Sequence, residues 1–206
     1  MLFGFTGTHR SGKSTTAKKV AETLGITYYS TSTTELANKL GVNPVKYMTM
    51  SDRVAFQCHV LENHLEMIDK LPRPLIVDRT PIDFLSYMLC EFTMNSSRTD
   101  TQNVLDRAKE YVDLCFEATS KLYDVIFCLA PLDKYVAEEG KPVENWPYQN
   151  NLAMTIRGAL SKATSMGVSA VLIENTDFDV RTTYVEEFLV ARMNQIWKAR
   201  NSSSLH

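Results

Sequence analysis

The feature of this sequence that most constrains its fold is a glycine-containing loop close to the N-terminus. Residues 7–14 read GTHRSGKS and match the pattern G-x-x-x-x-G-K-[ST] completely. A short apolar run, Leu2–Thr6, precedes the loop, and an apolar stripe at helical spacing follows it and ends before Gly25. The pattern requires a strand before it and a helix after it, and the flanking residues predict both. We therefore expect this loop to bind the phosphates of a nucleoside triphosphate.

Each part of the loop has a chemical reason to be there. Glycines let the backbone wrap around a phosphate chain, so that N–H groups and the positive end of the helix face the anion. Lys13 is expected to reach the β- and γ-phosphates, and the Ser14 hydroxyl is expected to hold Mg²⁺. We thus predict ATP as the phosphoryl donor and Mg²⁺ as the metal. The residues assigned to nucleotide binding are Gly7, Thr8, His9, Arg10, Ser11, Gly12, Lys13, Ser14 and Thr15.

Length and composition indicate an ordinary water-soluble domain. The chain of 206 residues is 44% hydrophobic and 22% charged, which fits a single α/β domain over 1–206. A net charge of −2 gives no basic field for sequence-independent nucleic-acid binding. The sequence shows no secretory signal, no long apolar run and no metal-binding cysteine spacing. We therefore expect a cytoplasmic protein, or one in the host cytoplasm if it is viral, with no membrane contact. His59 and His64 are expected on a helix surface.

Strand and helix patterns alternate along the chain, which predicts a parallel sheet with right-handed crossovers. Helices are expected to begin at Ser51 and Thr80, to span about 101–122, and to end the chain. The polar, turn-rich stretch 131–148 is expected to form a lid, and 201–206 a flexible tail. Beyond the first, the apolar runs that predict strands are Ile26–Tyr29, Leu75–Val77, Val125–Leu129 and Ala170–Ile173.

A second group of functional residues directly follows the apolar run Leu75–Val77. Asp78 and Arg79 fall at the carboxyl end of a buried strand, where open α/β sheets place their ligands. Asp78 either holds Mg²⁺ through water or accepts the proton of an attacking hydroxyl. Arg79 steadies an anionic acceptor or the transferring phosphoryl group. We therefore predict Lys13, Asp78 and Arg79 as catalytic residues and Ser14 and Asp78 as metal ligands, and interpret Asp83 as a helix cap.

The loop, the segment 78–87 and the late Asp179-Val180-Arg181 resemble the small P-loop kinases related to the nicotinamide riboside kinase domain. That group is also described as AAA-type ATPase domains. The resemblance implies a three-layer P-loop kinase-like fold with a parallel five-stranded sheet in the order 2-3-1-4-5 and a lid after the fourth strand. It also implies transfer of the γ-phosphoryl group of ATP to a small acceptor, assisted by Mg²⁺. Arg181 then either contacts the adenine side of ATP or caps the last helix.

A further resemblance, to deoxynucleoside kinases, concerns the acceptor. Their Phe-Gln pair lines the acceptor pocket, which implies that role for Phe56 and Gln57, with Arg53 contacting an acceptor phosphate. A core Phe56 and a solvated Gln57 fit the sequence equally well. Many nucleoside kinases carry an acid directly after the second strand. Here Glu35 is the first acid. Either Asp78 is the general base, or Glu35 reaches in, or the acceptor needs little help from a base. The cations expected in or beside the lid are Lys134, Lys141 and Arg157.

These residues support an ATP-dependent kinase of a nucleoside or nucleotide as the first hypothesis. The first alternative is a kinase of a hydroxymethylated pyrimidine within DNA, which would have to be flipped out or single-stranded. A basic rim of Arg73, Arg79 and Arg98 would support that modified-DNA acceptor. The second alternative is a non-catalytic nucleotide-sensing module. The sequence leaves a homodimer open.

Overall fold

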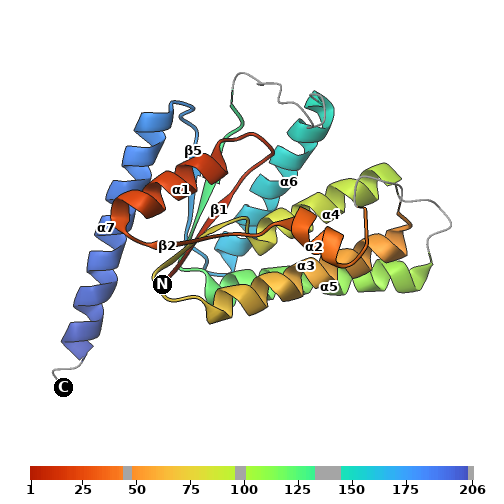
Figure 1. Ribbon diagram of the computed structural model, residues 1–206, viewed down its shortest axis with the longest axis horizontal. Helices are drawn as coiled ribbons and strands as arrows, with labels where there is room; N and C mark the ends of the chain where they lie inside the picture. Colours follow the sequence, from red (N-terminus) through yellow and green to blue (C-terminus); the bar gives the residue numbers. More distant parts are fainter. Residues whose placement is uncertain (44–47, 96–100, 133–144, 204–206) are drawn as a thin grey trace.

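The protein is built on a parallel sheet of five strands. In the computed structural model, which describes residues 1–43, 48–95, 101–132 and 145–203, the strands lie in the order β2-β3-β1-β4-β5 (Figure 1). This confirms the fold class and the strand order that the resemblance implied. Every predicted strand is present, with bounds that differ by at most one residue. The strands are β1 Leu2–Thr6, β2 Thr27–Ser30, β3 Leu75–Asp78, β4 Val125–Leu129 and β5 Ala170–Ile173.

Helices cover both faces of the sheet and make it the middle of three layers. Figure 1 shows α1 and α7 on one side and α3 to α6 on the other. Strand residues alternate between the faces: Phe3 and Phe5 pack with α1 and α7, whereas Leu2 packs with α3 to α6. The helices are α1 Lys13–Leu24, α2 Thr33–Lys39, α3 Met50–Lys70, α4 Pro81–Asn95, α5 Gln102–Leu122, α6 Trp146–Ser165 and α7 Phe178–Ser203.

The structure corrects the start that we predicted for α3. The N-cap is Thr49 and not Ser51, because Thr49 Oγ1 accepts a hydrogen bond from the Asp52 N–H at 3.1 Å. The same hydroxyl donates to Asp52 Oδ2 at 2.6 Å. A threonine followed three residues later by an acid is the better capping signal. Helix α2 was not predicted, because seven residues are too few for a clear apolar period.

The prediction that both histidines of α3 lie on its surface is confirmed for His59 and wrong for His64. The His64 ring is fully buried and bonds on both sides, with Nδ1 2.7 Å from Thr31 Oγ1 and Nε2 2.7 Å from Tyr123 Oη. Burial lowers the pKa of His64 to about 3, so the ring is neutral. His64 follows the core residue Leu61 by three positions, a spacing that places both on one helix face.

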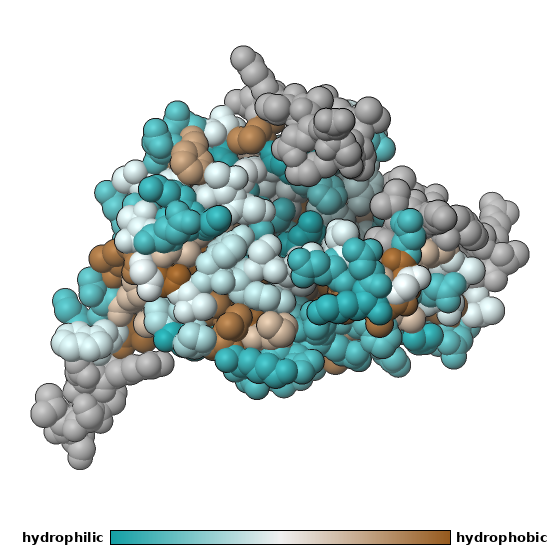
Figure 2. Space-filling model, viewed as in Figure 1, coloured by the Kyte–Doolittle hydropathy of each residue, from teal (hydrophilic) through white to brown (hydrophobic). Residues whose placement is uncertain are grey.

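Most of the predicted lid lies outside the described residues, which resume at Asn145, the N-cap of α6. Lys134 and Lys141 lie outside them as well. At the other end, α7 includes residues 201–203, which we had placed in a tail. Hydrophilic residues predominate on the face drawn in Figure 2, with hydrophobic residues in small separate patches. No helix in the described residues combines the length and apolar character needed to cross a membrane.

Candidate functional site

The predicted phosphate loop connects β1 to α1, as its flanks required. Gly7 lies so close to other chain segments that an added Cβ would stand 2.8 Å from both the Leu129 carbonyl oxygen and Ser11 Oγ. Gly12 is the N-cap of α1 with φ 76°, a left-handed conformation that favours glycine. The two glycines of the motif are therefore required by the geometry of the loop itself.

The interior of the loop is polar and incompletely paired. The side chain of Lys13, the first residue of α1, is buried. Burial lowers the pKa of its ammonium and Arg79 lowers it further, whereas the acids Asp83 and Asp78 raise it. The hydroxyls of Thr8, Ser11 and Thr16 are also buried, with no hydrogen-bond partner among the residues described. A buried cation beside unpartnered hydroxyls is an environment that a group with several anionic oxygens would satisfy.

Asp83 connects the phosphate loop to α4. As predicted for an acid in the first turn of a helix, it bonds back to Thr80, with Oδ2 accepting from Thr80 N–H at 2.8 Å and from Thr80 Oγ1 at 3.0 Å. Its other oxygen accepts a hydrogen bond from the Gly7 N–H at 3.3 Å. This second contact joins residues far apart in the chain, so the sequence pattern did not predict it.

Asp78, the last residue of β3, is buried beside the loop, with 2% of its surface exposed. Ser30 lies opposite it in the β2–β3 ladder and donates a hydrogen bond to Oδ2 at 3.2 Å. Tyr28 donates to the same oxygen at 3.5 Å; burial, and then the charge of Asp78, raises the pKa of this phenol to about 12, so it stays protonated. Oδ1 is buried and has no hydrogen-bond partner within the described residues. An unsatisfied buried oxygen is costly and marks a position for a ligand.

Arg79 adopts an unusual backbone conformation at the tip of β3. Its φ of 78° lies in the left-handed region, which is strained for a side chain of this size. Its N–H donates to the Phe5 carbonyl at 3.0 Å, and its guanidinium lies over the Tyr87 ring, 5.5 Å from the centroid. The Tyr87 ring in turn contacts His9 of the loop, with centroids 4.8 Å apart. Arg79, Tyr87 and His9 thus connect β3, α4 and the loop.

Arg181, assigned to the nucleotide or to a helix cap, and Arg157, assigned to the cations beside the lid, have different surroundings. Arg181 is 1% exposed and lies behind the loop, where Nη1 donates to the Ser11 carbonyl at 2.6 Å and Nε to the Asn175 carbonyl at 3.2 Å. Arg157 of α6 pairs with Glu174, after β5, at 2.8 and 2.9 Å. Arg181 therefore supports the backbone that would hold the phosphates, whereas Arg157 is engaged by an acid.

The predicted acceptor residues lie on α2 and α3. Glu35 is exposed in the first turn of α2. Arg53 forms an ion pair with Glu91 of α4 at 3.6 Å, and both side chains are partly buried. Gln57, one turn further along α3, accepts a hydrogen bond from the Tyr111 hydroxyl of α5 at 3.4 Å. Arg53 and Gln57 are thus held toward the helices that follow β3.

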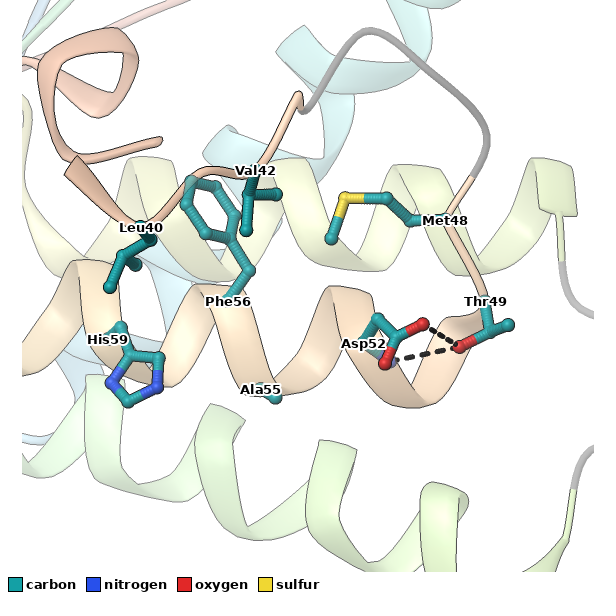
Figure 3. A pocket seen from close by; sticks show the side chains of 8 residues that line it. All are labelled: Leu40, Val42, Met48, Thr49, Asp52, Ala55, Phe56 and His59. Carbon is teal, nitrogen blue, oxygen red and sulfur yellow. Dashed lines mark hydrogen bonds between the residues drawn. The ribbon is translucent and has the colours of Figure 1, made fainter. Parts of the chain in front are cut away.

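Phe56 lies in different surroundings from Gln57. It is buried and lines a groove of about 530 Å³ between α3 and the segment before it. Figure 3 shows its ring directed toward Val42 and Leu40. The two residues of the Phe-Gln pair therefore do not line one common pocket in this structure. The remaining residues along the groove are Met48, Thr49, Asp52, Ala55 and His59.

The comparisons with known proteins agree with this geometry. A sequence model for a family described as an AAA domain matches residues 2–181. The chain belongs to this AAA-domain family. No curated protein sequence matches the AAA-domain protein.

Solved structures of low sequence identity share this fold, and a thymidylate kinase and a deoxyadenosine kinase are among them. Thymidylate kinase from Candida albicans matches with a TM-score of 0.66 at 18% identity, over 94% of this chain and 92% of that chain. Deoxyadenosine kinase from M. mycoides with bound dCTP matches with a TM-score of 0.61 at 15% identity, over 95% and 100%. NadR protein in complex with NR matches with a TM-score of 0.60 at 10% identity, over 84% of this chain and 45% of that chain. These likenesses show the fold.

In the AAA-domain protein Asp78 and Arg79 lie close enough to Lys13 for the charge of each to affect the pKa of the lysine.

Sequence reasoning missed Tyr87 and Glu91. Both follow Asp83 at intervals of four residues along α4, a helical spacing that would have placed them on the same face as that acid.

Proposed function

We propose that the AAA-domain protein transfers the γ-phosphoryl group of ATP to a hydroxyl or phosphate group of a nucleoside or nucleotide. The observation that carries the proposal is the buried, unpartnered Oδ1 of Asp78 beside the phosphate loop. Strands β1 and β3 are neighbours, so the loop after β1 and Asp78 at the end of β3 meet at one edge of the sheet. The fold shared with deoxyadenosine and thymidylate kinases also supports it.

The proposed chemistry uses positioning and charge. An oxygen of the acceptor forms a bond to the γ-phosphorus while the bond from that phosphorus to the β–γ bridging oxygen breaks, and ADP leaves. The acceptor proton passes to Asp78 Oδ1 where that oxygen does not coordinate the metal, and to solvent where it does. Lys13 and Arg79 stabilise the negative charge on the transferring group.

The residues at this edge of the sheet fit a magnesium ion. Ser14, exposed in the first turn of α1, and the unpartnered carboxylate oxygen of Asp78 are hard oxygen donors of the kind that Mg²⁺ prefers. These two residues would hold the ion, directly or through water. When bound, Mg²⁺ neutralises charge on the β- and γ-phosphate oxygens.

The decisive assay incubates the protein with Mg²⁺ and labelled ATP against panels of nucleosides, nucleoside monophosphates and an oligonucleotide carrying hydroxymethylated pyrimidines. We expect transfer to a nucleoside or nucleotide. Lys13→Ala should abolish it. Asp78→Asn should lower kcat by roughly 10² to 10⁴, while calorimetry shows nearly unchanged ATP binding.

Glu35→Gln is the matched comparison, because it tests the other acid that could act as base. A loss of kcat in Glu35→Gln with wild-type kcat in Asp78→Asn would assign the base to Glu35 and remove Asp78 from the mechanism. Hydrolysis of ATP that no acceptor stimulates would refute the kinase and favour a nucleotide sensor. Transfer to the modified oligonucleotide alone would favour the DNA kinase.

A further inference from the structure

The edge strand β2 ends in residues that carry hydroxyl groups, and the first acid after it is the exposed Glu35 of α2. In the parallel β2–β3 ladder Ser30 lies opposite Asp78. Tyr28 precedes Ser30 by two positions, so their side chains share one face of the strand. Tyr28 packs with the core cluster of α1 and α7, whereas Tyr29 packs with the cluster on the opposite face. Tyr28, Ser30 and Asp78 therefore lie on the side of the sheet that α1 covers.

Both hydroxyl groups bind the same oxygen of the Asp78 carboxylate. Ser30 Oγ donates to Oδ2 at 3.2 Å, and Tyr28 Oη donates to it at 3.5 Å. The terminal torsion of an aspartate is broad and roughly two-fold, so covalent geometry alone does not fix the orientation of the carboxylate. Two donors on Oδ2 restrict that rotation. They leave acceptor capacity on Oδ1, which is buried and has no hydrogen-bond partner among the described residues.

From this arrangement, and resting on the proposed function, we infer that Tyr28 and Ser30 are positioning residues for phosphoryl transfer. They hold the Asp78 carboxylate in the orientation that reserves Oδ1 for the metal ion or for the proton of the acceptor. Without these donors the carboxylate would populate more than one orientation, because neither oxygen would be fixed by a partner. Strand β2 thus contributes to the reaction through the acid of β3 instead of supplying an acid itself.

The test measures kcat with the acceptor that the panel identifies, together with the Kd of ATP by calorimetry. Tyr28→Phe and Ser30→Ala each remove one hydroxyl group, and we expect each to lower kcat by about 2- to 10-fold. The double variant should lower kcat by roughly 10- to 100-fold, the usual effect of losing the groups that orient a functional residue. The Kd of ATP should stay unchanged, because neither hydroxyl group belongs to the phosphate loop.

Two further variants of β2 serve as controls for these losses. Ser30→Thr keeps a hydroxyl group in a residue type that suits a strand, so it should retain wild-type kcat. Tyr29→Phe removes a hydroxyl group from the opposite face of the same strand, and it should also retain wild-type kcat.

A double-mutant cycle separates positioning from a general structural role. If the two hydroxyl groups act through Asp78, removing them from the Asp78→Asn variant should change its remaining kcat by less than about twofold. Crystal structures of the wild type and of the Tyr28→Phe/Ser30→Ala variant give a second measurement that does not depend on activity. The Asp78 carboxylate should adopt one orientation in the wild type and a rotated or a second orientation in the variant.

Three results would overturn the inference and leave the kinase proposal standing. They are wild-type kcat in the double variant, an equal loss of kcat when the hydroxyl groups are removed from Asp78→Asn, and an unchanged carboxylate orientation in the variant crystal. No transfer by the wild type to any acceptor would refute the kinase proposal and the inference together. If the double variant does not fold, the single variants compared with Ser30→Thr decide the question.

Discussion

Replacing His64 with glutamine should make the stability of the protein much less dependent on pH. His64 is fully buried between Thr31 and Tyr123, and burial lowers its pKa from 6.5 to about 3. In the unfolded chain the same imidazole titrates near 6.5. Below that pH the unfolded state therefore binds a proton that the folded state does not bind, and the folded state loses stability as the pH falls.

The size of the effect follows from this difference in pKa. Each pH unit below 6.5 removes about 1.4 kcal/mol from the free energy of unfolding until the pH reaches the folded pKa near 3. The loss from His64 is thus about 2.7 kcal/mol at pH 4.5 and about 5 kcal/mol near pH 3. Since small domains are stable by only about 5–15 kcal/mol, one buried histidine is enough to place acid unfolding within reach.

The assay is urea unfolding followed by far-ultraviolet circular dichroism between pH 7.5 and 4.5. Both tryptophans are largely exposed, so their fluorescence is a poor probe of the core. At pH 7.5 His64→Gln should itself be less stable by roughly 1–3 kcal/mol, because the two buried hydrogen bonds are disturbed. Its stability should then fall with pH by about 2.7 kcal/mol less than that of the wild type. His59→Gln, exposed on the same helix, serves as the control and should follow the wild type. Parallel wild-type and His64→Gln profiles would refute the reasoning.

Two further substitutions test the packing around the site. Gly4→Ala should destabilise the fold by about 1–3 kcal/mol in the same urea assay, because the new Cβ would lie 2.5 Å from Thr80 Cγ2 and 2.9 Å from the Tyr123 ring. Gly158→Ala, where nothing lies within 4 Å, is its control and should stabilise α6; equal effects would contradict the packing argument. Arg181→Gln should weaken ATP binding about tenfold in calorimetry by releasing a loop carbonyl, and an unchanged Kd would remove that supporting role.

The parts of the protein that the sequence determined are those with a local physical cause. The phosphate loop could be predicted because its glycines, lysine and flanking strand and helix are contiguous. The strands were found because buried parallel strands are continuous apolar runs. The cap at Asp83 was found because it needs only the residues of one helical turn.

Contacts between segments distant in the chain were decided only by the tertiary structure. The burial of His64 depends on Thr31 and Tyr123, which directly follow β2 and α5. The left-handed backbone of Arg79 has no signature in the residue type. The pairing of Arg53 with Glu91 joins two helices whose relative placement no local pattern specifies. Local sequence thus specifies the loop after β1 and the elements that flank it. The charges that surround the loop depend on how separate helices pack, because electrostatic neighbours are set by distance in space and not by distance along the chain.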